Sequence, residues 1–146
     1  MQRTKLVDEI GAFFEAHGMS RIAGQLFAYL LMSDPPEQSF DDLCAATGAS
    51  RGSVSTMTRV LVQLGMLERL PRGGRKLAYR VHPDAWTRLL EDDLRSATRL
   101  RELAGRGLRV TSRQRPEARK RLQEMQQFYE FLERQTERSL AAWKRR

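Results

Sequence analysis

Between residues 50 and 63, polar side chains recur at a spacing that places them on one face of a helix. The apolar residues Val54, Met57, Leu61 and Leu64 fall on the opposite face. A helix with an apolar back and short polar side chains in front suits the major groove of DNA, where it can approach base edges. The residues expected to contact DNA from this helix are Ser50, Arg51, Ser53, Ser55, Thr56, Arg59 and Gln63.

Three more cations surround a pair of glycines shortly after this helix. The glycines supply the positive φ angles of a tight hairpin turn, and Arg72, Arg75 and Lys76 flank them. Cations on a slim loop of this kind fit the DNA backbone or a minor groove. At the start of the helix over residues 51–64, free backbone N–H groups form a binding site for phosphate. The Arg59 side chain suits a guanine edge and a phosphate equally well.

The distribution of charge points to the same segment. The net charge of +8 is by itself a weak indication of a polyanionic partner. Residues 1–50 carry 3 basic and 7 acidic side chains, whereas residues 51–82 carry 7 basic and 1 acidic. The change from −4 to +6 between adjacent segments indicates a local surface for a polyanion, here double-stranded DNA.

Other classes of function find little support in the composition. One cysteine and two histidines cannot form a Cys/His zinc site within one chain, and no Ser-His-acid cluster suggests a catalytic triad. The sequence therefore predicts neither an enzyme nor a metal or cofactor site. No apolar run approaches the roughly 18–20 residues that a membrane span needs, which argues against a membrane partner. The single cysteine is typical of a reducing cytoplasm, and we expect a cytoplasmic protein associated with the nucleoid.

The elements that position the polar residues follow from apolar periodicity and capping signals. The spacing predicts helices over residues 2–16, from a Ser20 cap to Met32, from Ser39 to Gly48, and over residues 51–64. Strands are expected over residues 66–70 and 77–81. A helix over residues 83–104, a break that begins at Gly105 and Gly107 and continues over residues 111–116, and a last helix from Pro116 to about Trp143 complete the chain.

A short helix, a tight turn, a second helix and a hairpin, in this order, form a winged helix-turn-helix. We expect a mainly α-helical fold with a small β-hairpin, in which residues 41–81 contact DNA. The expected domains are an N-terminal dimerisation helix (1–17), the winged helix-turn-helix (18–82) and C-terminal dimerisation helices (83–146). Winged helices also serve as protein-interaction scaffolds without duplex DNA binding, and this remains the alternative function.

Several runs of residues resemble the GbsR-type branch of the MarR-like bacterial transcriptional regulators. The similarity covers residues 18–82 and is carried by the runs Gly18–Leu31, Ser33–Ser39, Thr47–Ser55 and Leu64–Arg69, together with Asp42-Leu43. The resemblance implies a regulator, more often a repressor, that binds a pseudo-palindromic operator as a homodimer. It also implies that a small-molecule effector of unknown identity can alter the affinity for DNA.

The resemblance further implies that the terminal helices form the dimer interface. The sequence supports a dimer independently, because the apolar seams of residues 83–104 and 116–143 exceed what a monomer of this length readily buries. The residues expected at the interface are Leu6, Ile10, Phe13, Leu94, Leu100, Leu122, Met125, Tyr129 and Leu132.

Overall fold

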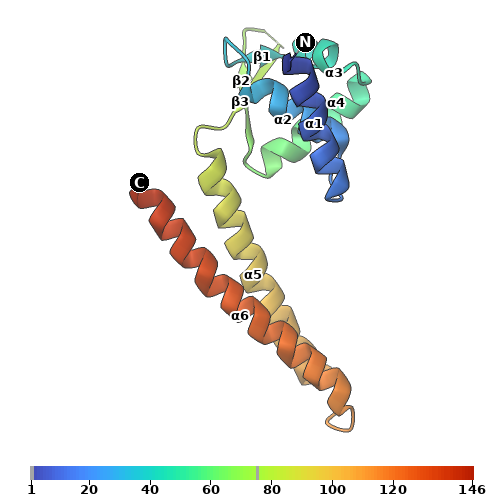
Figure 1. The fold of residues 1–146 in the computed structure, drawn as a ribbon, viewed down its shortest axis with the longest axis vertical. Helices are drawn as coiled ribbons and strands as arrows, with labels where there is room; N and C mark the ends of the chain where they lie inside the picture. Colours follow the sequence, from blue (N-terminus) through green and yellow to red (C-terminus); the bar gives the residue numbers. More distant parts are fainter. Residues whose placement is uncertain (1, 75) are drawn as a thin grey trace. The chain divides into compact units, whose positions relative to one another are not determined.

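A computed structural model describes residues 2–74 and 76–146, and it divides the chain into two compact units with the boundary between Ala85 and Trp86 (Figure 1). In the first unit lie α1 (Gln2–Ala16), α2 (Arg21–Leu31), β1 (Gln38–Ser39), α3 (Phe40–Thr47), α4 (Arg51–Gln63), β2 (Leu67–Pro71) and β3 (Leu77–Val81). The second unit consists of α5 (Ala85–Val110), apart from its first residue, and α6 (Pro116–Arg145). The mainly helical winged helix-turn-helix expected from the sequence is confirmed.

The first unit is built around α2, which contacts α1, α3, α4 and β3. Ser20 caps this helix as predicted, because its hydroxyl accepts a hydrogen bond from the Ala23 backbone N–H. Leu26 of α2 is fully buried, as are Leu43 of α3 and Leu61 of α4. One apolar core therefore fixes the two helices of the helix-turn-helix against a common support.

The crossing of α1 and α2 depends on two glycines at the point of closest approach. A Cβ atom placed on Gly24 would lie 2.9 Å from the Gly11 Cα atom and 2.8 Å from the Phe14 ring. Because one of these neighbours is backbone, the contact cannot relax by a simple rotation of a side chain. Any larger residue at position 24 must push the two helices apart.

We therefore expect the substitution Gly24→Val to lower the free energy of unfolding by about 2–3 kcal/mol, the upper part of the range for overpacked sites. Urea unfolding followed by circular dichroism measures this loss. Gly52→Ala is the matched control, because a Cβ at Gly52 meets nothing within 4 Å. That control should leave stability unchanged or raise it by up to about 1 kcal/mol. Equal effects of the two substitutions would contradict the close crossing.

The wing is a three-stranded antiparallel sheet with the strand order β1-β3-β2. Leu67 lies opposite Val81 and Pro71 opposite Leu77, so the predicted hairpin has the expected strands. The sequence analysis did not predict β1, whose Gln38 and Ser39 pair with Tyr79 and Ala78. A strand of two residues shows no alternation, and only its pairing with β3 defines it.

In the second unit, α5 and α6 run antiparallel and side by side (Figure 1). The prediction that α5 ends near Ala104 is wrong, because the helix continues through both Gly105 and Gly107 to Val110. Each glycine inside a helix costs about 1 kcal/mol relative to alanine. Close packing compensates for this cost: a Cβ on Gly107 would lie 2.9 Å from the Leu122 side chain, and one on Gly105 would lie 3.2 Å from Gln126.

Polar contacts join the two helices along their length. Near the turn, the Arg119 guanidinium donates hydrogen bonds to the Leu108 and Thr111 carbonyl oxygens, at 2.7 and 2.9 Å. In the middle, Thr98 and Arg101 both donate to the Glu133 carboxylate, and the hydrogen bond from Thr98 is the main cause of the lowered pKa of Glu133.

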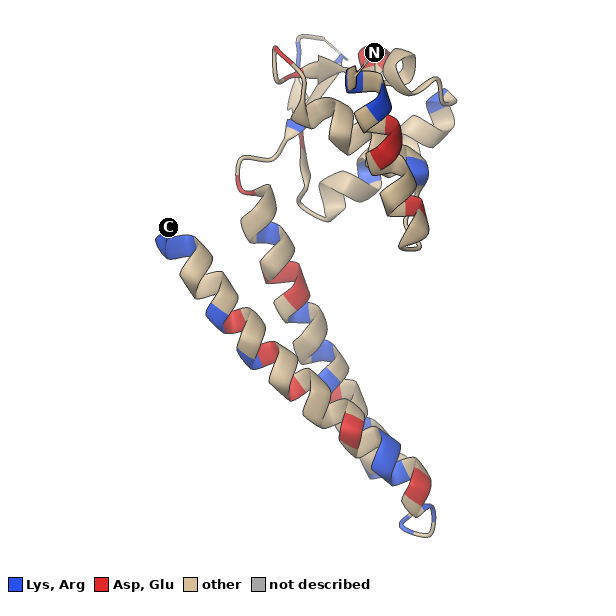
Figure 2. Cartoon of the chain, viewed as in Figure 1, with Lys and Arg blue, Asp and Glu red and all other residues tan. Residues whose placement is uncertain are grey.

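Basic side chains gather around the turn between α5 and α6 and at the C-terminal end of α6 (Figure 2). None of the described helices is long and apolar enough to span a membrane.

Candidate nucleic-acid interface

The two faces of α4 divide as the sequence predicted, with one addition. Val54 and Leu61 are fully buried and hold the helix to the core, while Met57 and Leu64 are half-buried. Thr58 is also in the core, with 2% of its surface exposed, and its hydroxyl donates to the Ser55 carbonyl oxygen at 3.0 Å. Because this hydrogen bond satisfies the hydroxyl locally, a residue that reads as polar in the sequence packs like a valine.

Ser50 and Ser53 form the N-terminal cap of α4. The Ser50 hydroxyl accepts a hydrogen bond from the Ser53 backbone N–H at 3.2 Å and donates to the Ser53 hydroxyl at 2.9 Å. Of the two residues, Ser50 is exposed and Ser53 is half-buried. Both side chains therefore shape the start of the helix, and the positive end of the helix dipole remains available to a phosphate.

Arg51 follows the cap and extends back toward α3. Its guanidinium lies 2.7 Å from the Asp41 carboxylate and 4.8 Å above the centre of the Phe40 ring. The hydrogen bond with Asp41 is the main cause of a raised pKa of Arg51, which stays protonated. The sequence analysis named Arg51 as a DNA contact but did not predict either of these neighbours.

The N-terminus of α3 is closed by a capping box. The Asp42 backbone N–H donates to the Ser39 hydroxyl, and the Ser39 backbone N–H donates to the Asp42 carboxylate, each at 3.0 Å. The hydrogen bond from the Ser39 backbone is the main cause of the lowered pKa of Asp42. The Asp42 carboxylate therefore caps α3, whereas Asp41 is the acid of this turn that contacts Arg51.

This lowered pKa predicts a pH-dependent contribution to stability. An acid with a lowered pKa in the folded state stabilises the protein above its unfolded pKa, and the effect is lost as the pH falls through the folded value. We expect Asp42→Asn to lower the free energy of unfolding at neutral pH by about 0.3–1 kcal/mol, the range for an exposed acid at a helix N-terminus. The difference from the native protein should shrink steadily below about pH 4. Urea unfolding at several pH values measures it, and a difference independent of pH would contradict the capping role.

The tip of the wing carries two of the predicted cations, Arg72 and Lys76, on an exposed loop. Gly73 and Gly74 have φ angles of 77° and 62°, as the turn requires, and the Arg72 backbone N–H donates to the Lys76 carbonyl oxygen at 3.0 Å. Arg72 and Lys76 are exposed. Arg75, the third predicted cation, lies outside the described residues.

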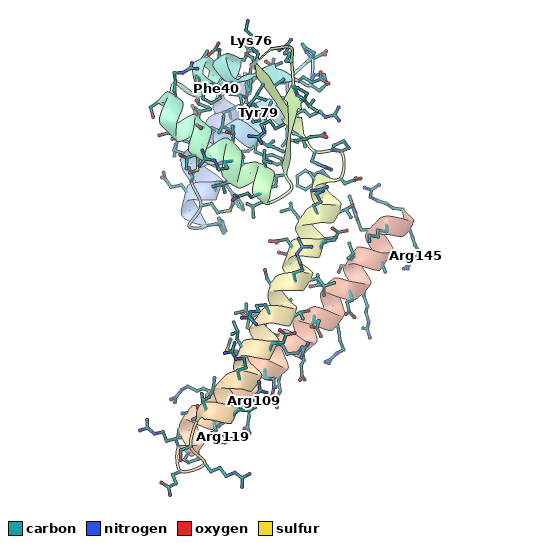
Figure 3. The ribbon with its side chains drawn as sticks, turned by 180° about the vertical axis from the view of Figure 1, so that it is seen from behind. Phe40, Lys76, Tyr79, Arg109, Arg119 and Arg145 are labelled. Carbon is teal, nitrogen blue, oxygen red and sulfur yellow. The ribbon has the colours of Figure 1, made fainter. Side chains whose placement is uncertain are left out.

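A hollow of about 650 Å³ lies between the wing and the N-terminal ends of α3 and α4. We call it the wing hollow. Figure 3 shows Phe40, Lys76 and Tyr79, three of its lining residues, at one end of the first unit. Its lining residues are Ser39, Phe40, Asp41, Arg51, Ser55, Arg72, Lys76, Leu77 and Tyr79. The structure thus brings the cation at the start of α4 and two cations of the wing around one concave surface.

A second, smaller hollow of about 330 Å³ lies further along α4. Arg59 and Gln63 line it, and both are exposed as predicted. Arg69 of β2 lines the same hollow, and the sequence analysis did not include it among the DNA contacts. Alternation along the strand gave no signal, because Arg69 lies on the same side of β2 as buried Leu67, and only its positive charge close to the glycine turn pointed to it. Thr56 is exposed, and its hydroxyl donates to the Gly52 carbonyl oxygen at 3.0 Å.

One cation of the wing belongs to the fold instead of to the interface. The Arg80 guanidinium lies 2.8 Å from the Glu68 carboxylate and 3.8 Å from the Glu37 carboxylate. These two acids neutralise Arg80 at the base of the wing. Around the two hollows beside α4, the exposed basic groups therefore come from the start and front of α4, from Arg69 and from the tip of the wing.

Taken together, the buried back of α4, its polar front and a basic wing within one compact unit define a winged helix-turn-helix regulator. The comparisons with known proteins agree with this class. The MarR family model matches residues 17–76, and the model described as MmpR5-like MarR family transcriptional regulator matches residues 84–146.

A curated relative and a solved structure show the same similarity over nearly the full chain. The HTH-type transcriptional regulator MmpR5 of Mycobacterium tuberculosis (strain ATCC 25618 / H37Rv) is 35% identical over 130 residues, which cover 88% of this chain and 79% of the relative. A transcriptional regulator of known crystal structure is 33% identical, with a TM-score of 0.91 and complete coverage of both chains. The chain belongs to the MarR family of DNA-binding transcriptional regulators and is MmpR5-like.

Family membership bears on two predictions from the sequence. It confirms that the protein is a regulator and not an enzyme, and it favours DNA binding over the alternative of a protein-interaction scaffold. These matches do not bear specifically on the GbsR-type branch that the sequence resembles.

Proposed function

We propose that the protein is a repressor that binds a pseudo-palindromic operator as a homodimer, with α4 in the major groove and the wing on the adjacent backbone. The assignment of particular residues to these roles is part of the proposal. Ser55, Thr56, Arg59 and Gln63 contact bases or nearby phosphates. The cap of α4, Arg51, and the cations of the wing contact the backbone.

The observation that carries this proposal is the position of the wing hollow. A helix in a major groove and a loop in the neighbouring minor groove are separated by one sugar-phosphate strand. The wing hollow lies between α4 and the wing, and Arg51, Arg72 and Lys76 provide three cations around it. The position of the wing hollow and its positive charge therefore suit a sugar-phosphate strand of DNA.

The dimer is supported by the apolar surface of the second unit. Of residues 86–146, all of which the structure describes, only Ala97, Ala104 and Thr136 are buried. Phe128 and Phe131 of α6 are 54% and 51% exposed. Two packed helices with so small a core need a further apolar partner, and a second copy of the chain is the partner that a palindromic operator requires.

The predicted interface residues are distributed over both units. In α1, Leu6 and Phe13 are exposed and Ile10 is half-buried. In α5 and α6 the predicted residues are all half-buried, namely Leu94, Leu100, Leu122, Met125, Tyr129 and Leu132. Their remaining exposed surface is available to the partner chain, and their role in dimerisation remains a proposal.

The test begins with selection of duplexes from a random-sequence library by the purified protein. We expect a pseudo-palindromic motif with half-sites one helical turn apart, about 34–36 Å between centres, bound by two chains per duplex. Affinity should fall steeply with salt, with a slope of roughly −0.9 per phosphate neutralised. Failure to enrich any motif, with equal affinity for all duplexes, would refute sequence-specific binding.

Repression and effector response require separate measurements. A reporter gene placed behind the selected operator should show lower expression when the protein is present, and higher expression would make it an activator. An effector would appear as a small molecule that changes the affinity for the selected operator. We propose that the protein acts in the cytoplasm at the nucleoid, and that its kinship with the GbsR-type branch concerns the helix-turn-helix segment.

A further inference from the structure

The contact between Arg51 and Asp41 serves no evident purpose in folding. The two side chains are 69% and 80% exposed, and ion pairs so exposed contribute at most about 1 kcal/mol to stability. The N-terminus of α3 already has its capping acid in Asp42. The dipole of α3 favours a second acid at position 41, but it does not explain why Arg51 is also stacked on Phe40.

The position of this contact points to DNA binding instead. Asp41, Phe40 and Arg51 all line the wing hollow, where the proposed function places a phosphate strand. An acid in such a place repels phosphate and competes for the N–H groups of Arg51. The guanidinium has five N–H donors in a planar fork, and the contact with Asp41 leaves donors on its other edge for a phosphate.

An arginine whose side chain is restrained by its neighbours acts differently from an unrestrained one, and the difference depends on whether the DNA complex is specific or non-specific. In non-specific complexes the protein has no fixed register, and affinity comes from cations that adapt to whichever phosphates they meet. In the specific complex, base contacts fix the register, so a phosphate lies at a defined position relative to α4. A guanidinium fixed by Asp41 and Phe40 can match that one position but cannot follow a phosphate elsewhere.

We propose that Asp41, together with Phe40, is a positioning residue that raises sequence specificity by restraining Arg51 and thereby weakening non-specific DNA binding. The proposal rests on the proposed sequence-specific function. Asp41 acts through Arg51 and through its own negative charge in the wing hollow. It lowers affinity for non-operator DNA more than it lowers affinity for the operator.

The test compares the native protein with Asp41→Asn on two duplexes of equal length and composition, one selected from the random library and one with the same bases scrambled. For the scrambled duplex we expect affinity to rise about 5-fold to 10-fold, with a salt slope steeper by roughly 0.9, because one more cation adapts to a phosphate. For the selected duplex we expect a smaller change. The ratio of the two affinities should therefore fall.

Two further variants separate this effect from a general change of charge or structure. Glu15→Gln removes one negative charge from the exposed pair with Arg21 on α1 and α2, outside the wing hollow, and it should leave the ratio unchanged. Phe40→Leu removes the ring below Arg51 without changing any charge, and it should lower the ratio in the same direction as Asp41→Asn. Asp41→Glu keeps the negative charge and should therefore keep most of the native ratio.

Each outcome decides the proposal. A ratio that Asp41→Asn leaves unchanged or raises would overturn it, as would an equal effect of Glu15→Gln. If circular dichroism shows that Asp41→Asn does not fold, Phe40→Leu provides the deciding ratio. A native protein that binds both duplexes equally would instead refute the proposed function, so the two failures are distinguishable.

Discussion

Replacing Phe128 and Phe131 together with glutamate should convert the proposed dimer to a monomer and lower operator affinity by about 100-fold or more. In the single chain both rings are more than half exposed, so the monomer loses little packing by the change. In the proposed dimer, each ring would contribute about 1.5–3 kcal/mol on becoming fully buried. A glutamate at the same place would bury a charge without a partner, which is strongly unfavourable.

The effect on DNA follows from the loss of the second binding head. Two linked heads bind a palindrome with an affinity about 10²–10⁴ times that of one head. Sedimentation velocity measures the mass in solution, and fluorescence anisotropy with the selected duplex measures affinity. Val110→Glu is the matched control, because Val110 is 84% exposed beside the turn between α5 and α6. A double variant that remains dimeric with native affinity would show that this face of α6 is not the interface.

Replacing Arg72 and Lys76 together with alanine should lower affinity by about 150-fold or more for every duplex, since hydrogen bonds of charged groups contribute about 1.5–3 kcal/mol each. Both cations line the wing hollow on the side of the wing. Loss of two phosphate contacts should also make the salt slope shallower by roughly 1.8. Because these contacts do not read bases, the motif selected from a random library should stay the same.

A control for this experiment removes two cations elsewhere. Lys120 and Arg121 are exposed near the start of α6 in the second unit, and their replacement by alanine changes the net charge equally. If both double variants weakened binding to the same extent, the effect would be one of net charge and the wing would have no special role.

Arg59→Ala gives the complementary result: a changed preference at one base position if Arg59 reads a base, or a uniform loss of affinity for all duplexes if it binds phosphate.

Local signals in the sequence were sufficient for most elements of the first unit. The caps at Ser20, Ser39 and Ser50 gave the starts of three helices, because each hydroxyl accepts a hydrogen bond from a backbone group a few residues away. The paired glycines of the wing indicated the turn because glycine readily adopts the positive φ angles that the turn requires. The change of net charge at residue 51 indicated which segment carries the cations, because the charge of a segment can be counted directly from its residues.

Contacts between distant residues decided what the sequence analysis missed or mistook. Helix α5 continues through Gly105 and Gly107 because α6 packs closely against both, and no local rule contains that compensation. Strand β1 exists only through its pairing with β3. Thr58 is buried because α4 packs against the core of the first unit, and the local hydrogen bond of its hydroxyl only makes that burial possible.

The sequence by itself determined the class of protein, the order of its helices and of the two hairpin strands, and the polar face of α4, since all three depend on residue type and short-range spacing. Only the tertiary structure showed that Arg51 rests on Phe40 beside Asp41 and faces the cations of the wing across one hollow. Arg51 and Asp41 are ten residues apart and lie on different helices. Their contact depends on how α3 and α4 pack on α2, and packing of this kind leaves no periodic trace in the sequence.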